Sequence, residues 1–575
     1  MPDIDYREIV DMLEACPDPK QSDTKVDFGD FGNPRQYGVP HDTWRPNQLD
    51  ALRFVRKSVD EKDGSPFFME LPTGSGKSAI PTAIGQKQQV LVLVNSLSLL
   101  DQYESKYGFS IVKGMREYPC VNKDSIEYWK SKHSKPPTVA DCRFEAMSDC
   151  PVADRCPYLV ARKQALAADR MACTYPFAML SKPVQLRRGL LFMDEGHMAA
   201  ETILALSEIR FSDTFLKDYG LPKFPVMNVE CVMTLDIRIQ LSNWMKECLR
   251  ILKSPPRNLF AEDEAKWRNA YSKMYYAFWT INDKHEDFFI TAKPDLEQER
   301  YMLYGKWTER PKPGLVIKFM SARTIAERIF KYKEKTIVMS ATIGEPGPLA
   351  EELGMKKYVS KSYGHPIPIA KRPVFDVGFE RMTWDNMRQM PALQRMQAVT
   401  IGKFIRTLDP QWRGLILTSS YAKAGEIRKY LETTELRDRL YQPPAGQEGL
   451  NQRINAFIAD DRPGMIVVDP MQGWGHGIDL SHDLARFVIV ASVPFGNHQD
   501  PYEKARKSFG NANYAWWKSY MHVPQACGRV TRGEQYENGE YWYNVGMLAD
   551  GSATTGSAMR YYPGWFTEAI QPLNI

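Results

Sequence analysis

Residues 66–84, PFFMELPTGSGKSAIPTAI, restrict the fold more than any other stretch of this sequence. A short apolar run leads through the loop GSGKS at residues 74–78 into a helical pattern. A strand, a glycine-rich loop and a helix in this order form one unit of a parallel sheet covered by helices. Successive backbone N–H groups in such a loop point at phosphate oxygens, so we predict a nucleotide-binding site rather than an ordinary turn.

The same alternation of strands and helices continues along the chain in two blocks. Strand-like runs follow at QVLVLVN, GLLFMDE and KTIVMSAT, and again after residue 395 at RGLILTSS, GMIVVDP, RFVIVASVPF and EYWYNVGML. A chain of 575 residues is also too long for one hydrophobic core. We therefore expect an α/β fold with two α/β units.

A stretch of different character, about 140 residues long, separates GLLFMDE from KTIVMSAT. Its apolar side chains recur at helical spacing in two stripes: Leu241, Trp244, Met245 and Cys248, then Trp267, Tyr271, Met274 and Phe278. This spacing predicts an inserted helical subdomain with these side chains in its core. The alternative is that the aromatic side chains stack on nucleic-acid bases.

The composition excludes several classes of protein but does not select one. The chain has 75 Lys and Arg against 70 Asp and Glu, and a net charge of +5 permits nucleic-acid binding without requiring it. The apolar runs fall short of the ~20 residues that cross a bilayer, and no basic-then-apolar leader opens the sequence. Nine cysteines without a secretion signal make a disulfide framework unlikely. We expect a cytoplasmic protein that does not associate with membranes.

The phosphate loop assigns a role to several side chains. Lys77 would neutralise charge on the β- and γ-phosphates, and the Ser78 hydroxyl would complete the Mg²⁺ shell. The commonest form of this motif has a glycine where the chain has Leu71. The remaining residues that we expect to bind ATP in this loop are Thr73, Gly74, Ser75 and Gly76.

A second motif supplies the carboxylates that an NTPase needs at the end of a neighbouring strand. The stretch LLFMDEGH places Asp194 and Glu195 directly after an apolar run. Asp194 would hold Mg²⁺ through its water, and Glu195 would act as the general base on the attacking water. The alternative is a charged strand end without a catalytic role.

Together these two motifs resemble those of the superfamily 2 helicases, whose second motif is commonly DEAH or DEAD. Here it is DEGH, with Gly196 in place of alanine. The resemblance implies that His197 keeps its role beside the two carboxylates. It also accounts for Leu71, because this superfamily commonly lacks the first glycine.

Further motifs follow in the order of that superfamily. RPNQ, from Arg45 to Gln48, resembles the motif that reads adenine, which implies ATP as the fuel. VLVNSLSLLDQY resembles the motif that touches nucleic acid, through Asn95 and Ser96. SAT resembles the motif that couples hydrolysis to movement, and its residues are Ser340, Ala341 and Thr342.

The second α/β unit contributes three more motifs. TSSY resembles a motif that contacts nucleic acid, and the contacting residues would be Ser419 and Tyr421. GWGHGIDL resembles a motif that binds ATP, and the binding residues would be Gly477 and Asp479. The most specific match is QACGRVTRG, in which Gln525, Gly528, Arg529 and Arg532 fit the pattern Q-x-x-G-R-x-x-R.

Arg529 and Arg532 are three residues apart on a predicted helix, so both can point into one cleft. There they would meet the γ-phosphate from the second unit and act, with Gln525, in catalysis. The alternative is a pair of solvent-facing arginines.

Four of the nine cysteines, Cys120, Cys142, Cys150 and Cys156, fall within 37 residues. They contain no C-x-x-C pair, which structural zinc sites usually show. By the number of ligands alone, either zinc or an iron–sulfur cluster fits.

The segment that holds these cysteines is similar to the 4Fe-4S domain of the XPD/DinG helicases, in which the last ligand is commonly followed by Pro-Tyr, here Pro157 and Tyr158. The resemblance implies that the four cysteines hold a 4Fe-4S cluster, whereas Cys173 belongs to the core. It also implies two RecA-like motor domains with an inserted cluster domain and a helical Arch-like domain. The implied divisions are 1–40 for a polar lead-in, 41–107 with 161–205 and 325–375 for motor domain 1, 108–160 for the cluster, 206–324 for the Arch and 376–575 for motor domain 2.

The function that this resemblance implies is an ATP-dependent DNA helicase. Members of the family move 5′ to 3′ on single-stranded DNA, so the expected partners are single strands and forked or tailed duplexes, or RNA:DNA hybrids. A monomer with a role such as DNA repair is expected, with ATP, Mg²⁺ and a 4Fe-4S cluster as cofactors. Two alternatives remain: an ATP-regulated nucleic-acid clamp or recruitment factor that separates no strands, and a zinc-stabilised motor without a cluster.

Overall fold

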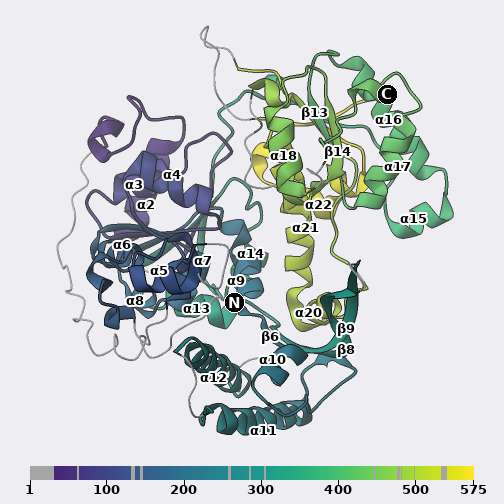
Figure 1. Cartoon of the computed structure of the whole chain (residues 1–575). Coiled ribbons are helices and arrows are strands. Elements are labelled where there is room, and N and C mark those ends of the chain that lie inside the picture. Colours follow the sequence, from purple (N-terminus) through teal and green to yellow (C-terminus); the bar gives the residue numbers. More distant parts are fainter. Residues whose placement is uncertain are drawn as a thin grey trace.

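A computed structural model of the chain shows two α/β units and a third region, which is inserted into the sequence of the first unit (Figure 1). It describes residues 31–574 apart from 61–63, 131–135, 143–146, 257–260, 284–286, 304–305, 446–448, 475–479, 481, 498 and 532–540. The first α/β unit is the purple to blue lobe of Figure 1, and the second is the green to yellow lobe.

The first unit is built on a parallel sheet of seven strands in the order β11-β1-β10-β5-β2-β4-β3. In chain order the strands are β1 (Phe67–Glu70), β2 (Val90–Val94), β3 (Ser110–Val112), β4 (Arg170–Thr174), β5 (Leu190–Met193), β10 (Lys335–Ser340) and β11 (Val359–Ser362). The helices are α2 (Gln48–Asp60), α3 (Ala79–Ile84), α4 (Leu97–Tyr107), α5 (Lys123–Lys130), α6 (Pro157–Ala167), α7 (Tyr175–Leu180), α8 (Lys182–Leu186), α9 (Ala199–Ser207), α13 (Arg323–Phe330) and α14 (Gly347–Glu352).

Helices cover both faces of this sheet, which explains why its central strands β1, β2, β5 and β10 are buried along their whole length. In β2 all five residues are buried. Leu91 and Leu93 belong to one core cluster, and Val90, Val92 and Val94 belong to another. This alternation follows from the two-residue period of a strand, which sends successive side chains to opposite faces.

The strand order decides where the motifs meet. β10 lies between β1 and β5, so the phosphate loop, the SAT motif and the DEGH motif follow three adjacent parallel strands. The carboxyl ends of parallel strands share one edge of a sheet, where ligands of such folds bind. Residues 110–112 also belong to this sheet, as its edge strand β3, although the sequence prediction assigned 108–160 to the cluster domain.

The second unit has a parallel sheet of six strands in the order β14-β13-β15-β16-β12-β17. The strands are β12 (Val374–Asp376), β13 (Gly414–Thr418), β14 (Ile466–Pro470), β15 (Phe487–Val490), β16 (Val545–Leu548) and β17 (Ile570–Pro572). The helices are α15 (Trp384–Gln389), α16 (Leu393–Thr407), α17 (Tyr421–Leu431), α18 (Leu450–Ala459), α19 (Met471–Trp474), α20 (Pro501–Arg506), α21 (Ala512–Cys527), α22 (Gly556–Tyr561) and α23 (Gly564–Thr567).

The inserted region contains the predicted helices and also an antiparallel sheet that the sequence analysis did not predict. Its helices are α10 (Asp213–Asp218), α11 (Leu235–Leu252) and α12 (Ala261–Ile281), and its strands, in the order β6-β9-β8-β7, are β6 (Ile209–Ser212), β7 (Val229–Val232), β8 (Phe288–Leu303) and β9 (Lys306–Phe319). The paired stem 288–292 with 315–319 carries buried apolar side chains. The segments beyond the stem are rich in charged residues and proline, which do not give the pattern of a half-buried strand.

The stripe on α11 forms part of the core, as the helical spacing indicated. Leu241, Met245 and Cys248 are fully buried and Trp244 nearly so. On α12 only Met274 of the predicted stripe is fully buried, and its aromatic members pack half-buried against the same core. Cys173, on β4, is also fully buried, as expected.

The inserted sheet is attached to the second unit as well as to the first. In Figure 1, α20 lies beside β8 and β9. Tyr502 of α20 donates a hydrogen bond from its hydroxyl to the carbonyl of Phe319 (2.6 Å), and its ring meets Phe289 edge-on at 5.5 Å. Arg506 of the same helix lies within 2.9 Å of Glu352, which belongs to the first unit. These contacts hold three regions together at one place.

Among the described residues, none of the helices combines the length and the apolar character needed to cross a membrane. The predicted lead-in 1–40 lies mostly outside the described residues. Of its described part, Phe31 and Val39 are buried in the core of the first unit, so these residues pack more closely than a loose lead-in would.

Candidate active site

The phosphate loop has a backbone that only glycine adopts without strain. Gly74 and Gly76 have φ values of 81° and 71°, in the left-handed region. The side-chain amide of Gln48 donates to the carbonyl of Gly76 (2.9 Å), and the guanidinium of Arg45 donates to the carbonyl of Gly74 (2.9 Å). The start of α2 therefore holds the loop in place.

These contacts give Arg45 and Gln48 a role that the motif alone did not reveal. Both were expected to bind ATP through the adenine base, and the structure places both directly against the phosphate loop. Gln48 is nearly inaccessible, and its carbonyl oxygen accepts a hydrogen bond from the backbone N–H of Arg45 (2.8 Å). Their contact with adenine stays a prediction.

Asp194 lies buried at the end of β5, with both carboxylate oxygens hydrogen-bonded. The hydroxyl of Tyr103 donates to Oδ2 (2.8 Å), and the backbone N–H of Glu195 donates to Oδ1 (2.9 Å). Burial, reinforced by the neighbouring carboxylate of Glu195, raises the pKa of Asp194, and the ammonium of Lys77 acts in the opposite direction. A cation at this position would therefore relieve an unfavourable buried charge.

Glu195 has a left-handed backbone, with φ 49° and ψ 42°, although it is not a glycine. Such a conformation costs about 1–3 kcal/mol and persists only where the surroundings enforce it. Its carboxylate lies 4.0 Å from Nζ of Lys77 and 3.4 Å from Nδ1 of His197. The strained turn thus aims the carboxylate of the expected general base at the lysine of the phosphate loop.

A chain of hydrogen bonds joins the two α/β units through the motifs. Nδ1 of His197 lies 2.8 Å from Oγ of Ser340, and Nε2 lies 3.2 Å from the side-chain amide of Gln525. The same amide donates to Oγ1 of Thr342. Three motifs, from β5, β10 and α21, therefore share one buried polar network.

Arg529 lies at the end of this network. It is buried to 5% exposure, and its guanidinium donates to Oε1 of Gln525 (3.4 Å). Nearby, Oγ1 of Thr73 in the phosphate loop donates to the carbonyl of Thr531 (3.5 Å). The segment that carries the predicted arginine finger therefore touches the phosphate loop. Arg532, Gly477 and Asp479, predicted to lie in the same cleft, fall outside the described residues.

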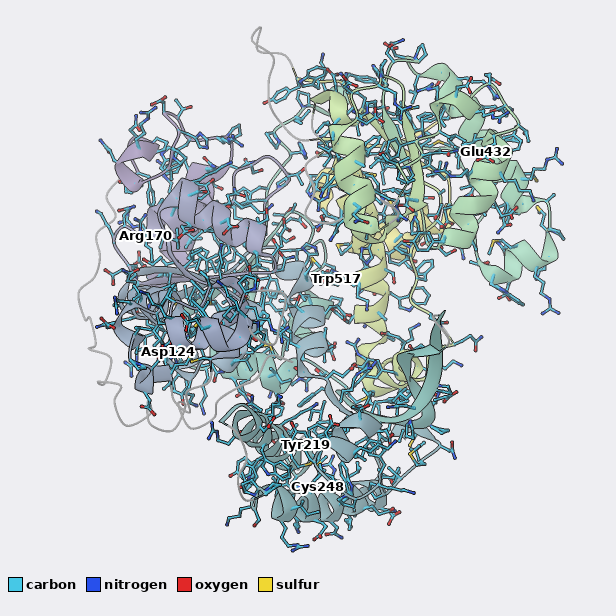
Figure 2. The ribbon with its side chains drawn as sticks, in the orientation of Figure 1. Asp124, Arg170, Tyr219, Cys248, Glu432 and Trp517 are labelled. Carbon is cyan, nitrogen blue, oxygen red and sulfur yellow. The ribbon has the colours of Figure 1, made fainter. Side chains whose placement is uncertain are left out.

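The segment 341–345, which contains the end of the SAT motif, is held from both sides. From the first unit, Oε2 of Glu70 accepts hydrogen bonds from the backbone N–H groups of residues 343 and 344, at 2.8 and 2.5 Å. From the second unit, the indole N–H of Trp517 donates to the carbonyl of Ile343 (2.7 Å), and that of Trp565 donates to the carbonyl of Ala341 (2.9 Å). Figure 2 shows Trp517 where the two lobes meet.

The four clustered cysteines line one cavity. The other residues that line it are Val121, Asn122, Val139, Met147 and Val152. Four cysteines around one cavity fit the Cys₄ ligation of an iron–sulfur cluster, and by number alone they also fit zinc.

The predicted nucleic-acid contacts lie after strands of both units. Ser96 caps α4 through the N–H of Leu99 (3.3 Å), and Asn95 donates to Sδ of Met198 (3.1 Å). In the second unit, Oγ of Ser419 accepts a hydrogen bond from Ser492 (3.1 Å). Tyr421 is 63% exposed, which leaves its ring accessible to a base.

Sequence reasoning missed four side chains of this site: Glu70, Tyr103, Trp517 and Trp565. Glu70 and Tyr103 lie inside quoted motifs, and a carboxylate at the end of an apolar strand was a signal that could have been used. No local pattern points to the two tryptophans, because their partners are backbone carbonyls more than 170 residues away.

In comparison with known proteins, each α/β unit matches a different protein-family model. The model of the helicase C-terminal domain family matches residues 409–567, and the model of the type III restriction enzyme res subunit family matches residues 41–217. The chain is 22% identical over 296 residues to the XPD/RAD3 helicase subunit of the general transcription and DNA repair factor IIH of Saccharomyces cerevisiae. This match covers 48% of the chain but only 36% of the yeast protein.

Solved structures show the same fold over nearly the whole chain. An XPD helicase matches with a TM-score of 0.53 and 14% identity, over 93% of this chain and 100% of its own. Xpd4 of S. tokodaii matches with a TM-score of 0.51 and 12% identity, over 92% and 100%. The chain therefore has the fold of the XPD helicases, in which its two α/β units correspond to RecA-like domains, as the motifs predicted.

Each α/β unit thus matches a family model of its own, and over nearly the whole chain the fold is similar to that of the XPD helicases.

Proposed function

We propose that this protein is an ATP-dependent DNA helicase that moves 5′ to 3′ along single-stranded DNA. The observation that carries the proposal is the contact of Gln525 in the second unit with His197 and Thr342 in the first. A nucleotide held by the phosphate loop would lie beside this contact. Opening or closing of the cleft would then depend on the state of the nucleotide.

The residues of the cleft divide the reaction among them. Lys77 neutralises phosphate charge, and Ser78 and Asp194 would hold Mg²⁺, which supplies charge neutralisation between the phosphates when bound. Glu195 takes the proton of the attacking water, and Arg529 stabilises the charge that develops on the γ-phosphate. Gln525 and His197 would transmit the change in nucleotide state to the SAT motif, which the second unit also contacts.

The four cysteines Cys120, Cys142, Cys150 and Cys156 would hold a 4Fe-4S cluster. When bound, the cluster would cross-link the segment 120–156 and supply a one-electron redox centre. Protein purified without oxygen should be brown and contain about four iron atoms per chain. A colourless protein that binds zinc instead would contradict this part of the proposal.

Single-stranded DNA is the proposed partner, with forked or tailed duplexes and RNA:DNA hybrids as substrates. The similarity to XPD helicases supports the choice of DNA and the direction of movement. Contacts should be mainly to phosphates, with exposed aromatic side chains such as Tyr421 stacking on bases, so sequence preference should be slight. We further propose a monomer that works in the cytoplasm, where thiols remain reduced.

The test is an unwinding assay on duplexes with a 5′ tail, a 3′ tail or a fork, with wild-type protein and Glu195→Gln. Wild type should unwind the 5′-tailed and forked substrates, and Glu195→Gln should bind them without unwinding. Strong DNA-stimulated ATPase without unwinding of any substrate would favour a clamp or recruitment factor instead. Unwinding from 3′ tails would refute the direction.

A further inference from the structure

Tyr103 is a fully buried side chain whose hydroxyl contacts Asp194, an expected ligand of Mg²⁺. It comes from α4, and its hydroxyl donates to Oδ2 of Asp194 at 2.8 Å. The side chain of Ser78 lies near the same hydroxyl. The phenol therefore lies beside both residues that we expect to hold Mg²⁺ and is hydrogen-bonded to one of them, Asp194.

The ring of Tyr103 is fixed by packing that does not need its hydroxyl. It meets Phe109 edge-on at 5.2 Å and Tyr107 at 5.9 Å, in the core between α4 and the sheet. A phenylalanine would make the same ring contacts. A buried hydroxyl costs free energy unless it is hydrogen-bonded, and here the chain has placed it against a buried carboxylate.

The hydrogen bond from Tyr103 is one of two that hold the carboxylate of Asp194. Asp194 Oδ1 accepts from the backbone N–H of Glu195 (2.9 Å), and Oδ2 accepts from Tyr103. Two donors on opposite oxygens fix the plane of the carboxylate. A side chain that orients a ligating carboxylate in this way commonly contributes 10–100-fold to metal affinity.

We propose that Tyr103 is a positioning residue of the Mg²⁺ site, which acts by orienting the carboxylate of Asp194. Tyr103 touches neither nucleotide nor water in this role. The proposal rests on the proposed ATP site but not on strand separation, so it holds for a helicase and for a clamp alike.

The test removes the hydroxyl alone, with Tyr103→Phe in the full-length protein. Mn²⁺ serves as the probe, because free Mn²⁺ can be counted by electron paramagnetic resonance while protein and ADP are titrated. We expect Tyr103→Phe to weaken Mn²⁺ binding about 10-fold. The affinity for ADP in the presence of EDTA should stay within about twofold of wild type, because the phosphate loop is unchanged.

Tyr107→Phe is the matched control. Tyr107 lies one turn later on α4, is also buried, and packs against the same ring. Its loss of a hydroxyl should leave Mn²⁺ binding unchanged. Equal weakening in both variants would mean that packing is responsible, and would overturn the proposal.

A double-mutant cycle separates orientation from general stability. In the background of Asp194→Asn, Tyr103→Phe should cause no further loss of Mn²⁺ affinity, because both act through one ligand. Additive losses would overturn the proposal, as would wild-type Mn²⁺ affinity in a folded Tyr103→Phe protein. Normal Mn²⁺ and ADP binding in a wild-type protein without unwinding would instead count against the helicase and leave this proposal standing.

Discussion

Replacing Gln525 with leucine should open the cleft between the two units while leaving each unit folded. Gln525 is 3% exposed, and its amide reaches Thr342 and His197 while its carbonyl accepts from Arg529. Leucine keeps a similar volume but leaves these buried polar groups without their partner. A buried group left without its partner costs about 1–3 kcal/mol.

About 2 kcal/mol is therefore the expected cost to the closed state, which corresponds to a ~30-fold change in its population. DNA-stimulated ATPase should show the same ~30-fold fall in kcat/KM, since hydrolysis needs the closed cleft. The assay is steady-state ATP hydrolysis over a range of ATP concentrations with saturating single-stranded DNA.

Gln397→Leu is the control for this experiment. Gln397 is as deeply buried, and its amide donates to the carbonyls of Ala491 and Ala549 (2.6 Å each), all within the second unit. It should lower the midpoint of thermal unfolding without a specific fall in kcat/KM at 25 °C. Wild-type kcat/KM in Gln525→Leu, or an equal fall in Gln397→Leu, would refute the role of the shared network.

Other substitutions test separate parts of the structure. Lys77→Ala should abolish ATP hydrolysis and unwinding but leave the iron content unchanged; retained unwinding would contradict the phosphate loop. Cys150→Ser should lose iron, measured by absorbance and metal analysis, without loss of ADP binding. Gly344→Ala should lower DNA-stimulated ATPase at least ~10-fold. The φ of Gly344 is 56°, and a Cβ there would lie 1.7 Å from the carbonyl oxygen of residue 561. Gly364→Ala is the control, because a Cβ at residue 364 would meet open space. Burial raises the pKa of Glu352 from 4.5 to about 6, so the folded protein binds this proton more tightly than the unfolded chain. Wild type should therefore lose stability relative to Glu352→Gln as the pH rises from 4.5 to about 6, in denaturant unfolding across that range.

The sequence predicted the parts of the fold that depend on local pattern. The strands after which Lys77, Asp194 and Ser340 lie were visible as apolar runs, because strands buried on both faces have no polar positions. The adjacency of these three strands was not visible, since it depends on pairing between segments more than 140 residues apart.

The inserted sheet shows where pattern fails. Much of its long hairpin, between residues 293 and 314, is rich in charged residues and proline, so the sequence shows no two-residue apolar period there. The same holds for the contact of Trp517 with Ile343: an indole that donates to a backbone carbonyl leaves no mark on the sequence around its acceptor.

The attachment of the inserted sheet to α20 has a mechanical consequence. Tyr502 and Arg506 belong to the second unit. They bond to backbone carbonyls at the base of the β8–β9 hairpin, and Arg506 also pairs with a carboxylate at the end of α14 in the first unit. Any rotation of the second unit relative to the first would therefore also displace the stem of the hairpin. The inserted region would then move together with the second unit.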